Sequence, residues 1–473
     1  MARRTILTIL WLLSAHMPAV IAQTSSPKRT CTEKVLAELE KDELPDSTRA
    51  SPDARRIAWT VAIGDKTVVV LDGIKSKEYG HVADISFSPD GKRFAYVAMR
   101  DDGKKLVLVV GGVEGKGYDG FHEENRYFGP DGNSIAYEVR DGDHFKVVHD
   151  DVESKGYRGG ACPPVFSPDG KRIAYAAFPE PEPSTRILVV VDGKEGPLYD
   201  GLDARSPLFS PDSRKCVYLA KKADRFVVVI DGVESPEFES ISLPVFSPDG
   251  SKLAYFGKRE GVDSLYVDGK RTEDFLPEDA CEHVPYFSPD GRRLAYSRRR
   301  AGKWSLVLDG KSEGSWDNIG EESFRFSSDG KRYACVCFHG EKSGMFLDGK
   351  EDFRGDETAG PAFRFSPDGM KTIWAFRSGK QGIVVSDGKE GKPWDGLGDE
   401  FVFDRRSKHS AFAAKTNGKW TVVVDGAPGG VYDFVIAFRK KYRGGGIVFD
   451  SPDSVHYLVR RGKQVLLVEE RIG

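Results

Sequence analysis

The stretch Phe166-Ser167-Pro168-Asp169-Gly170-Lys171-Arg172-Ile173-Ala174-Tyr175 recurs, with drift, from near residue 50 to the C-terminus of the 473-residue chain. The recurrence has a period of roughly 39 residues, which is typical of propeller and solenoid repeats. Its Ser-Pro-Asp signature, or a degenerate form of it, begins at Ser51, Ser88, Gly129, Ser167, Ser210, Ser247, Ser288, Ser327, Ser366, Asp404 and Ser451. We therefore expect one structural unit to be repeated eleven times.

One repeat divides into four short strands, which we call a to d. Strand a contains Pro164-Val165-Phe166, and Ser-Pro-Asp-Gly then forms a turn, because proline presets φ and glycine accepts the left-handed conformation. Strands b and c, at 172–177 and 187–191, are rich in small and β-branched residues that suit a packed sheet. Asp192-Gly193 favours a tight hairpin leading to strand d around Leu198-Tyr199. Four antiparallel strands joined in this way make one propeller blade.

An aromatic residue recurs shortly after the Asp-Gly position. A side chain that returns at one place in every repeat indicates packing between blades rather than ligand stacking. The recurring aromatic residues are Tyr79, Tyr118, Tyr157, Tyr199, Phe238, Phe275, Trp316, Phe353, Trp394 and Tyr432.

The two rims of such a propeller differ in sequence. Since strands alternate in direction, the Ser-Pro-Asp-Gly and Asp-Gly turns lie together on what we call the constant rim. The b–c and d–a connections lie on the opposite, variable rim, where differences between repeats on a rigid scaffold indicate specificity. The candidate binding residues on the variable rim are His122, Glu123, Glu124, Arg126, Arg298, Arg299, Arg300, Arg439 and Tyr442.

The repeats resemble the WD-repeat-like β-propellers of the TolB type, whose blades carry a Phe-Ser-Pro-Asp-Gly-Lys-Arg-Ile-Ala-Tyr signature. That signature is nearly intact at 87–96, 166–175, 246–255, 287–296 and 365–374. The resemblance implies an all-β propeller in the bacterial envelope. The chain departs from the family's pattern in having eleven repeats instead of six blades, and in lacking the separate α/β domain of TolB.

The number of repeats bears on the domain organisation. Propellers usually have four to eight blades. We therefore predict two tandem propellers, split near residues 240–245, in preference to one large or open ring. Both arrangements are compatible with the sequence.

The N-terminus is typical of a secretory signal peptide. Arg3 and Arg4 precede an apolar run, and Val20-Ile21-Ala22 fits a cleavage site. Cleavage after Ala22 predicts a periplasmic or secreted protein with no transmembrane segment left.

Residues 23–49 separate the signal peptide from the repeats, which span 50–473. Within them, the spacing of Val35, Leu36 and Leu39 predicts one short helix inside 32–43.

Charge and composition narrow the function further. The net charge is −3 and the basic residues are spread through every repeat, so no basic stripe for nucleic acid is formed. The nine histidines show no zinc spacing such as His-Glu-x-x-His. The six cysteines do not share one repeat position, and their pairing cannot be deduced. We expect no nucleic-acid partner, no metal and no cofactor.

These observations predict an exported, non-enzymatic binding or scaffold protein, monomeric, that engages an envelope or extracellular protein, peptide or glycan through its b–c and d–a loops. No residue is assigned a catalytic role, and the question of enzymatic activity stays open. The alternative is a hydrolase or lyase built on the propeller loops and acting on envelope or extracellular polysaccharide. Such an enzyme would place two carboxylates about 5–10 Å apart at one channel mouth.

Overall fold

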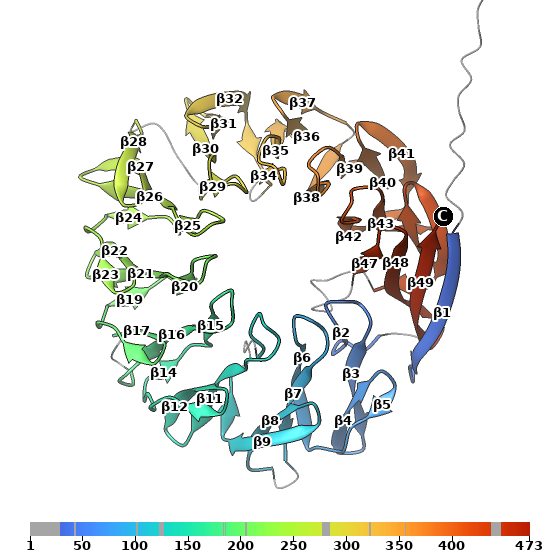
Figure 1. The fold of residues 1–473 in the computed structure, drawn as a ribbon, viewed down its shortest axis with the longest axis horizontal. Helices are drawn as coiled ribbons and strands as arrows, with labels where there is room; N and C mark the ends of the chain where they lie inside the picture. The colour runs from blue at the N-terminus through green and yellow to red at the C-terminus, as the bar shows by residue number, and fades with distance from the viewer. Residues whose placement is uncertain are drawn as a thin grey trace, which may run out of the picture.

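A computed structural model describes residues 29–41, 44–100, 103–122, 127–182, 184, 186–203, 206–276, 284–320, 323–354, 356–436 and 446–473, without the side chains of 357–362. Its strands form eleven antiparallel sheets that stand around one axis as the blades of a ring (Figure 1). The described residues contain no helix, and the predicted all-β propeller is confirmed. None of them builds an apolar helix long enough to cross a membrane. The predicted signal peptide lies outside the described residues.

We number the blades 1 to 11 in chain order and give their strands from a to d, with strand a in two pieces in five blades. Blades 1 to 4 are formed by β2 (Arg49–Ala50), β3 (Ile57–Ile63), β4 (Lys66–Leu71) and β5 (Ile74–Lys75); β6 (His81–Phe87), β7 (Phe94–Met99), β8 (Leu106–Val110) and β9 (Val113–Tyr118); β10 (Gly120–Phe121), β11 (Ala136–Asp141), β12 (His144–His149) and β13 (Val152–Glu153); and β14 (Gly160–Ala161) with β15 (Val165–Phe166), β16 (Ile173–Phe178), β17 (Leu188–Val191) and β18 (Lys194–Glu195). Blades 5 to 8 are formed by β19 (Gly201–Leu202) with β20 (Leu208–Phe209), β21 (Cys216–Lys222), β22 (Arg225–Ile230) and β23 (Val233–Glu234); β24 (Ser240–Ile241) with β25 (Val245–Phe246), β26 (Leu253–Arg259), β27 (Val262–Val267) and β28 (Lys270–Asp274); β29 (Tyr286–Phe287), β30 (Leu294–Arg300), β31 (Lys303–Leu308) and β32 (Lys311–Trp316); and β33 (Asn318–Ile319) with β34 (Arg325–Phe326), β35 (Tyr333–His339), β36 (Lys342–Leu347) and β37 (Lys350–Asp352). Blades 9 to 11 are formed by β38 (Glu357–Phe365), β39 (Thr372–Ser378), β40 (Gln381–Ser386) and β41 (Lys389–Trp394); β42 (Gly396–Phe403), β43 (Ser410–Thr416), β44 (Lys419–Val424) and β45 (Ala427–Tyr432); and β46 (Phe434–Val435) with β47 (Ile447–Ser451), β48 (Ser454–Arg461), β49 (Gln464–Ile472) and, from the other end of the chain, β1 (Arg29–Glu38).

Strand β1 closes the ring as the outermost strand of blade 11. It pairs antiparallel with β49, from Arg29 opposite Ile472 to Glu38 opposite Gln464. Figure 1 shows β1 in blue beside the red β49. The helix predicted inside 32–43 is therefore wrong. Its helical spacing is a weak local preference, and it yields to hydrogen bonding with the otherwise unpaired edge of β49.

All eleven blades belong to one ring, so the prediction of two tandem propellers is wrong. Eleven clusters of buried apolar side chains each join two adjacent blades. One cluster spans the proposed split near 240–245, with Leu219 of blade 5 against Tyr255 of blade 6. Another joins the ends of the ring, with Leu467 of blade 11 against Trp59 of blade 1. A blade with two apolar faces needs a neighbour on each side, and a closed ring supplies one for every blade.

The recurring aromatic residues fill these junctions, as predicted. Nine of the ten are at most 5% exposed, and Phe353 is half-buried. Most also make a polar link to the next blade. In blade 2, for example, Lys116 and the Tyr118 hydroxyl donate hydrogen bonds to the Glu153 carboxylate of blade 3, and these bonds lower the pKa of Glu153 to about 2.

A buried ion pair fastens the closing strand. The guanidinium of Arg29 on β1 contacts the Glu470 carboxylate on β49, and these side chains are 9% and 1% exposed. The Tyr457 hydroxyl donates a 2.5 Å hydrogen bond to the same carboxylate, and Arg29 Nη1 donates to the Ala427 carbonyl of blade 10 at 2.8 Å. Blades 10 and 11 are thus connected through one charged group of the N-terminal strand.

We expect Glu470→Ala to lower the free energy of unfolding by about 3–5 kcal/mol, because it leaves the Arg29 charge buried without its partner. The matched control is Glu469→Ala on the same strand. Its carboxylate is 48% exposed and pairs with Arg55 at the surface, so the expected loss is below about 1 kcal/mol. Urea denaturation of both variants measures the difference, and equal losses would contradict the role of the buried pair.

Candidate functional site

The constant rim is built from one hydrogen-bonded turn. In blade 8, the Ser327 hydroxyl donates to Asp329 at 2.6 Å and accepts the Arg332 N–H at 2.9 Å. Gly330 completes the turn at a φ of 69°, in the left-handed region that favours glycine. The hydroxyl contact lowers the pKa of Asp329. The turn, whose sequence in this blade is Ser-Ser-Asp-Gly, is therefore held by hydrogen bonds within itself.

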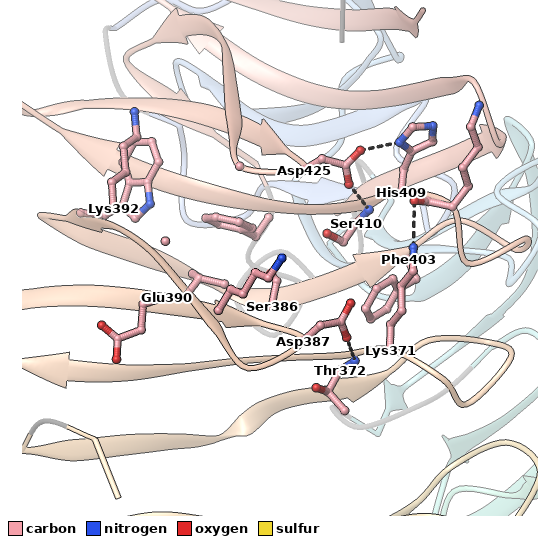
Figure 2. Close-up of a pocket in the computed structure, with 17 residues that line it drawn as sticks. Lys371, Thr372, Ser386, Asp387, Glu390, Lys392, Phe403, His409, Ser410 and Asp425 are labelled. Atoms are coloured by element: carbon pink, nitrogen blue, oxygen red, sulfur yellow. Dashed lines mark hydrogen bonds and ion pairs between the residues drawn. The ribbon is translucent and has the colours of Figure 1, made fainter. Parts of the chain in front are cut away.

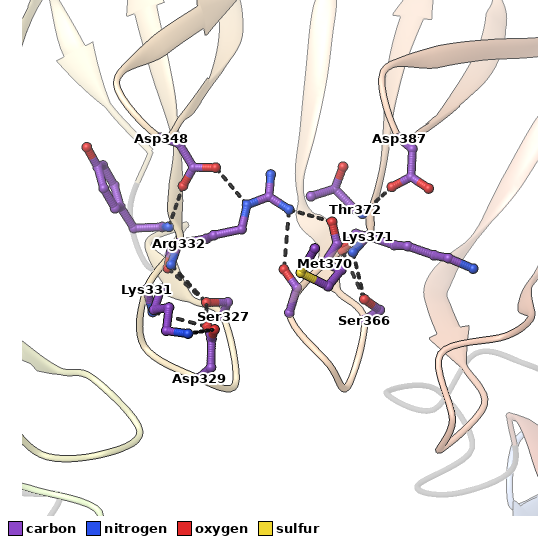
Figure 3. A network of polar contacts seen from close by, with 12 residues as sticks. Ser327, Asp329, Lys331, Arg332, Asp348, Ser366, Met370, Lys371, Thr372 and Asp387 are labelled. Carbon is purple, nitrogen blue, oxygen red and sulfur yellow. Dashed lines mark hydrogen bonds and ion pairs between the residues drawn. The ribbon is translucent and has the colours of Figure 1, made fainter.

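An arginine then links this turn to the neighbouring blade, and we call the link the arginine clasp (Figure 3). Arg332 Nε donates to Asp348, in the c–d turn of its own blade, at 2.7 Å. Its Nη1 donates to the carbonyls of Gly369 and Met370, in the turn of blade 9, at 3.3 and 2.7 Å. Because one side chain bonds both turns, they lie on one rim, as predicted. The complete clasp is made by Arg56, Arg172, Arg293 and Arg332.

We expect Arg332→Gln to cost about 1–2 kcal/mol of stability, because it removes charge-assisted hydrogen bonds at a partly exposed junction. The adjacent Lys331 is the control, since its side chain is 83% exposed and pairs with Asp329 of its own turn. Lys331→Gln should change stability by less than about 0.5 kcal/mol. Thermal unfolding of the two variants measures the difference. An unchanged stability in Arg332→Gln would show that the clasp does not stabilise the ring.

The variable rim is more regular than predicted. In seven blade junctions, an acidic residue near the end of strand d accepts a backbone N–H from the next blade's b–c turn at 2.6–3.1 Å. These b–c turns are tight, and a longer one, at 179–186, connects β16 and β17 in blade 4. The acceptors are Asp119, Asp200, Glu239, Asp317, Asp356, Asp395 and Asp433.

Five of the predicted binding residues, Glu123, Glu124, Arg126, Arg439 and Tyr442, lie outside the described residues. Their role in binding stays a prediction.

The other four predicted binding residues lie in two separate blades. His122 follows β10 in blade 3 and is half-buried, while Arg298, Arg299 and Arg300 end β30 in blade 7. Arg298 is 13% exposed and donates to Glu273 of blade 6 at 3.2 Å, so it links two blades. Arg299 and Arg300 are exposed. The structure does not bring His122 and these arginines into one site.

Gly310-Lys311-Ser312-Glu313-Gly314 matches the spacing of a hydrolase nucleophile elbow, which joins a strand to a helix. Here it spans a c–d turn and the first residues of strand β32. The Ser312 hydroxyl accepts a 2.7 Å hydrogen bond from Arg298. The local structure is that of an ordinary blade.

The clasp is altered between blades 9 and 10, where a cavity of about 340 Å³ opens (Figure 2). In blade 9 the arginine position holds Lys371, which donates to the Lys408 carbonyl at 3.3 Å. In blade 10 it holds His409. Both residues border the cavity on the constant rim.

His409 and Asp425 form a close pair at this cavity. The imidazole Nδ1 lies 2.5 Å from an Asp425 carboxylate oxygen, and the other oxygen accepts the Ser410 N–H at 2.9 Å. In the neutral imidazole, this arrangement places the proton on Nδ1 and the lone pair on Nε2. His409 is 8% exposed, and its Nε2 is buried with no hydrogen-bond partner in the described part of the chain. Such a group is uncommon in a folded protein and calls for a reason.

Further charges surround the pair. The Asp387 carboxylate accepts the Thr372 N–H at 2.8 Å, and no basic side chain of the described residues pairs with it. Lys408 pairs with Asp453 of blade 11 at 2.8 Å, which lowers the pKa of Asp453. The cavity therefore presents an acceptor at Asp387 and several ammonium groups within one small space.

At this cavity, and within the described residues, Trp394 lacks the hydrogen bond to the next blade that the equivalent tryptophan of blade 7 makes. Trp394 is 3% exposed and lies beneath Lys392, whose Nζ is 4.3 Å from the ring centroid. In blade 7 the equivalent Trp316 donates to Glu351 of the next blade at 2.7 Å. Strand β45 of blade 10 begins Ala-Pro-Gly-Gly and supplies no such carboxylate.

A sequence signal for this site existed in the repeats themselves. His409 stands where most repeats have arginine or lysine, and Asp404 stands where they have serine. Asp404 replaces the serine hydroxyl by accepting the His409 N–H at 2.6 Å. The variation between loops indicates the variable rim, whereas this site is marked by residues that depart from otherwise constant positions of the repeat.

A second cavity, of about 540 Å³, lies at the corresponding place between blades 1 and 2. Arg56, Arg93 and Ile74 are among the residues that border it. Both cavities are on the constant rim.

No known protein-family model matches the chain, and a comparison with curated proteins finds no match. Similar solved structures include a eukaryotic initiation factor, at 11% identity and a TM-score of 0.41 over 76% of this chain and 89% of that one. They also include TolB from Acinetobacter baumannii (15%, 0.27, 54% and 78%) and the β-propeller domain of the Trilobed protease from Pyrococcus furiosus (18%, 0.29, 66% and 97%). At TM-scores below 0.5 these likenesses carry no weight for function, and the propeller assignment rests on the chain's own eleven sheets. Membership of the TolB-like family stays a prediction.

Proposed function

We propose that this β-propeller is an exported, non-enzymatic binding or scaffold protein that engages a protein, peptide or glycan through the cavity between blades 9 and 10. The observation that carries this is the buried Nε2 of His409, which has no partner in the described residues. An unsatisfied buried nitrogen costs free energy, and a ligand that donates a hydrogen bond to it recovers that cost.

The chemistry of the cavity favours a ligand with both hydroxyl and acidic groups. Of the residues that line it, Asp387 and a neutral His409 accept hydrogen bonds, whereas Lys371 and Lys389 donate them. Apolar side chains such as Phe403 and Phe412 line the same space. An acidic sugar of a glycan, or an acidic peptide segment with a hydroxyl side chain, meets these requirements. Arg299 and the loops of the variable rim lie on the opposite rim from this cavity, so binding there would be a separate contact.

Hydrolysis or lyase cleavage of a polysaccharide is the second candidate function. The His409–Asp425 pair favours it, because an imidazole oriented by a carboxylate is the arrangement in which histidine acts as a general base. A carboxylate within reach of the same substrate, such as Asp387, could serve as the acid. This candidate differs from binding in one measurable respect, the appearance of product.

Arrays of acidic glycans and acidic peptides, probed with the mature chain, test the binding function. We expect Lys389→Gln and His409→Gln each to weaken capture of a bound array member about tenfold, since each removes a hydrogen bond or charge facing the ligand. Lys350→Gln is the matched control, because Lys350 begins strand d of blade 8 as Lys389 begins that of blade 9. Capture that is unchanged in both cavity variants would refute this site.

The same array members distinguish the second candidate. Incubation with any bound glycan, followed by a reducing-end assay and by detection of unsaturated sugar products, reports cleavage. Release of product by the native chain but not by His409→Gln would establish the enzyme and overturn the non-enzymatic function.

A further inference from the structure

Blade 2 departs from the other blades at its c–d turn. In nine blades, an aspartate in that turn accepts the N–H of the first residue of strand b, or in blade 3 of Ile135 just before it, at 2.8–3.2 Å. These aspartates have φ between 46° and 51°. In blade 2 the same position is Gly111, at a φ of 58°, and it is followed by Gly112. The backbone of the turn is thus retained, but no carboxylate is supplied.

The backbone donor for that carboxylate is still in place. Phe94 pairs with Phe87 as Ile173 pairs with Phe166, and the Gly111 N–H donates to the Phe94 carbonyl at 2.9 Å. In blade 4 the equivalent bond, from Asp192 to Ile173, is 3.0 Å, and the Ile173 N–H donates to the Asp192 side chain. By this register, the Phe94 N–H is directed to the position that an aspartate carboxylate would occupy.

The cationic donor is also in place. In four blades the clasp arginine donates through Nε to the turn aspartate at 2.7–2.9 Å. Arg93 keeps the other half of the clasp, because its Nη1 donates to the Gly132 and Asn133 carbonyls and its guanidinium lies 5.3 Å from the Phe128 ring centroid. Within the described residues its Nε has no acidic partner. Arg93 is thus positioned like the clasp arginines that donate to an aspartate carboxylate.

The cavity of about 540 Å³ between blades 1 and 2 opens at this point. A Cβ added at Gly111 or Gly112 would meet no atom within 4 Å, so the position is spacious. Apolar side chains of Leu71, Val110 and Ile74 line the cavity, and Ile74 is 76% exposed. Asp72, the acidic residue at its border, is already paired with Arg56.

We propose that this cavity binds a carboxylate carried on a compact apolar group. The carboxylate accepts from the Phe94 N–H and from Arg93, as the turn aspartate does in the complete clasps of blades 1, 4, 7 and 8. The apolar group packs against Ile74, Leu71 and Val110. The C-terminal residue of a peptide and a short fatty acid share this chemistry. The site lies in a different blade junction from the cavity of the proposed function. The two proposals are therefore independent and can be tested separately.

Calorimetric titration of the mature chain at neutral pH uses N-acetyl-leucine as the peptide-like probe and hexanoate as the fatty-acid probe. We expect saturable binding of at least one, and binding at least about tenfold weaker for its amide, which lacks the charge. The tighter of the two probes identifies the source. Failure of both acids to bind, or equal binding of acid and amide, would overturn the site.

Gly111→Asp is the most discriminating variant, because its own side chain supplies the carboxylate that the ligand would otherwise provide. We expect it to abolish binding and to raise the unfolding temperature. Gly111→Ala, which adds a Cβ but no acid, should keep the affinity within about twofold, and Ala54, Ala223 and Ala301 already adopt φ of 49–52° in this chain.

Arg93→Gln should weaken binding about tenfold or more, whereas Arg172→Gln, whose turn aspartate is in place, should not change it. Undiminished binding by a folded Gly111→Asp or Arg93→Gln variant would refute the assignment.

Discussion

Pairing of β1 with β49 is the contact on which the rest of the ring depends. Within the described residues, blades 1 to 10 are each made from one continuous stretch of chain, and their hydrogen bonds are local. Blade 11 takes its outer strand from the other end of the chain, and the apolar junction between blades 11 and 1 includes Ala37 of β1 with Leu39 just beyond it. Glu33 on β1 also gives Tyr432 the carboxylate that Tyr118 and Tyr157 obtain from the following blade. The N-terminal strand is therefore a full substitute for a strand d.

Polar side chains connect the blades at three levels of the ring. On the constant rim the connection is the arginine clasp. Between the outer strands it is the bond from a recurring aromatic residue to a glutamate of the next blade, such as Tyr118 to Glu153. On the variable rim it is the acidic residue that accepts a backbone N–H from the next blade's b–c turn. A residue that departs from the pattern leaves a hydrogen-bonding group without its usual partner. Both cavities that we describe lie at such departures, at His409 in one junction and at Gly111 in the other. In a protein this regular, an exception to a local rule is the most informative guide to a site.

Much of the fold could be predicted because its determinants are local. The Ser-Pro-Asp-Gly turn, the Asp-Gly turn and the strands between them are each specified within a few residues, and the buried aromatics follow from their fixed position. The number of rings depends instead on contacts such as Leu467 with Trp59, which are distant in sequence. The identity of β1 was missed for the same reason, since its partner lies at the opposite end of the chain. The cavity at His409 could have been found by comparing the repeats with one another, whereas the pairing of its Nδ1 with Asp425 required coordinates.

The position of β1 has a consequence for how the protein is made. Ribosomes produce chains from the N-terminus, and domains fold as their residues become available. Of the described strands, β1 is therefore synthesised first, and its partner β49 is synthesised last. Until then β1 is an unpaired strand and the last face of blade 1 is uncovered, which exposes both to pairing with other chains. Charged residues are spaced along β1 (Arg29, Glu33, Lys34 and Glu38). Charge on an exposed edge strand opposes aggregation, so these residues would protect β1 until β49 is synthesised.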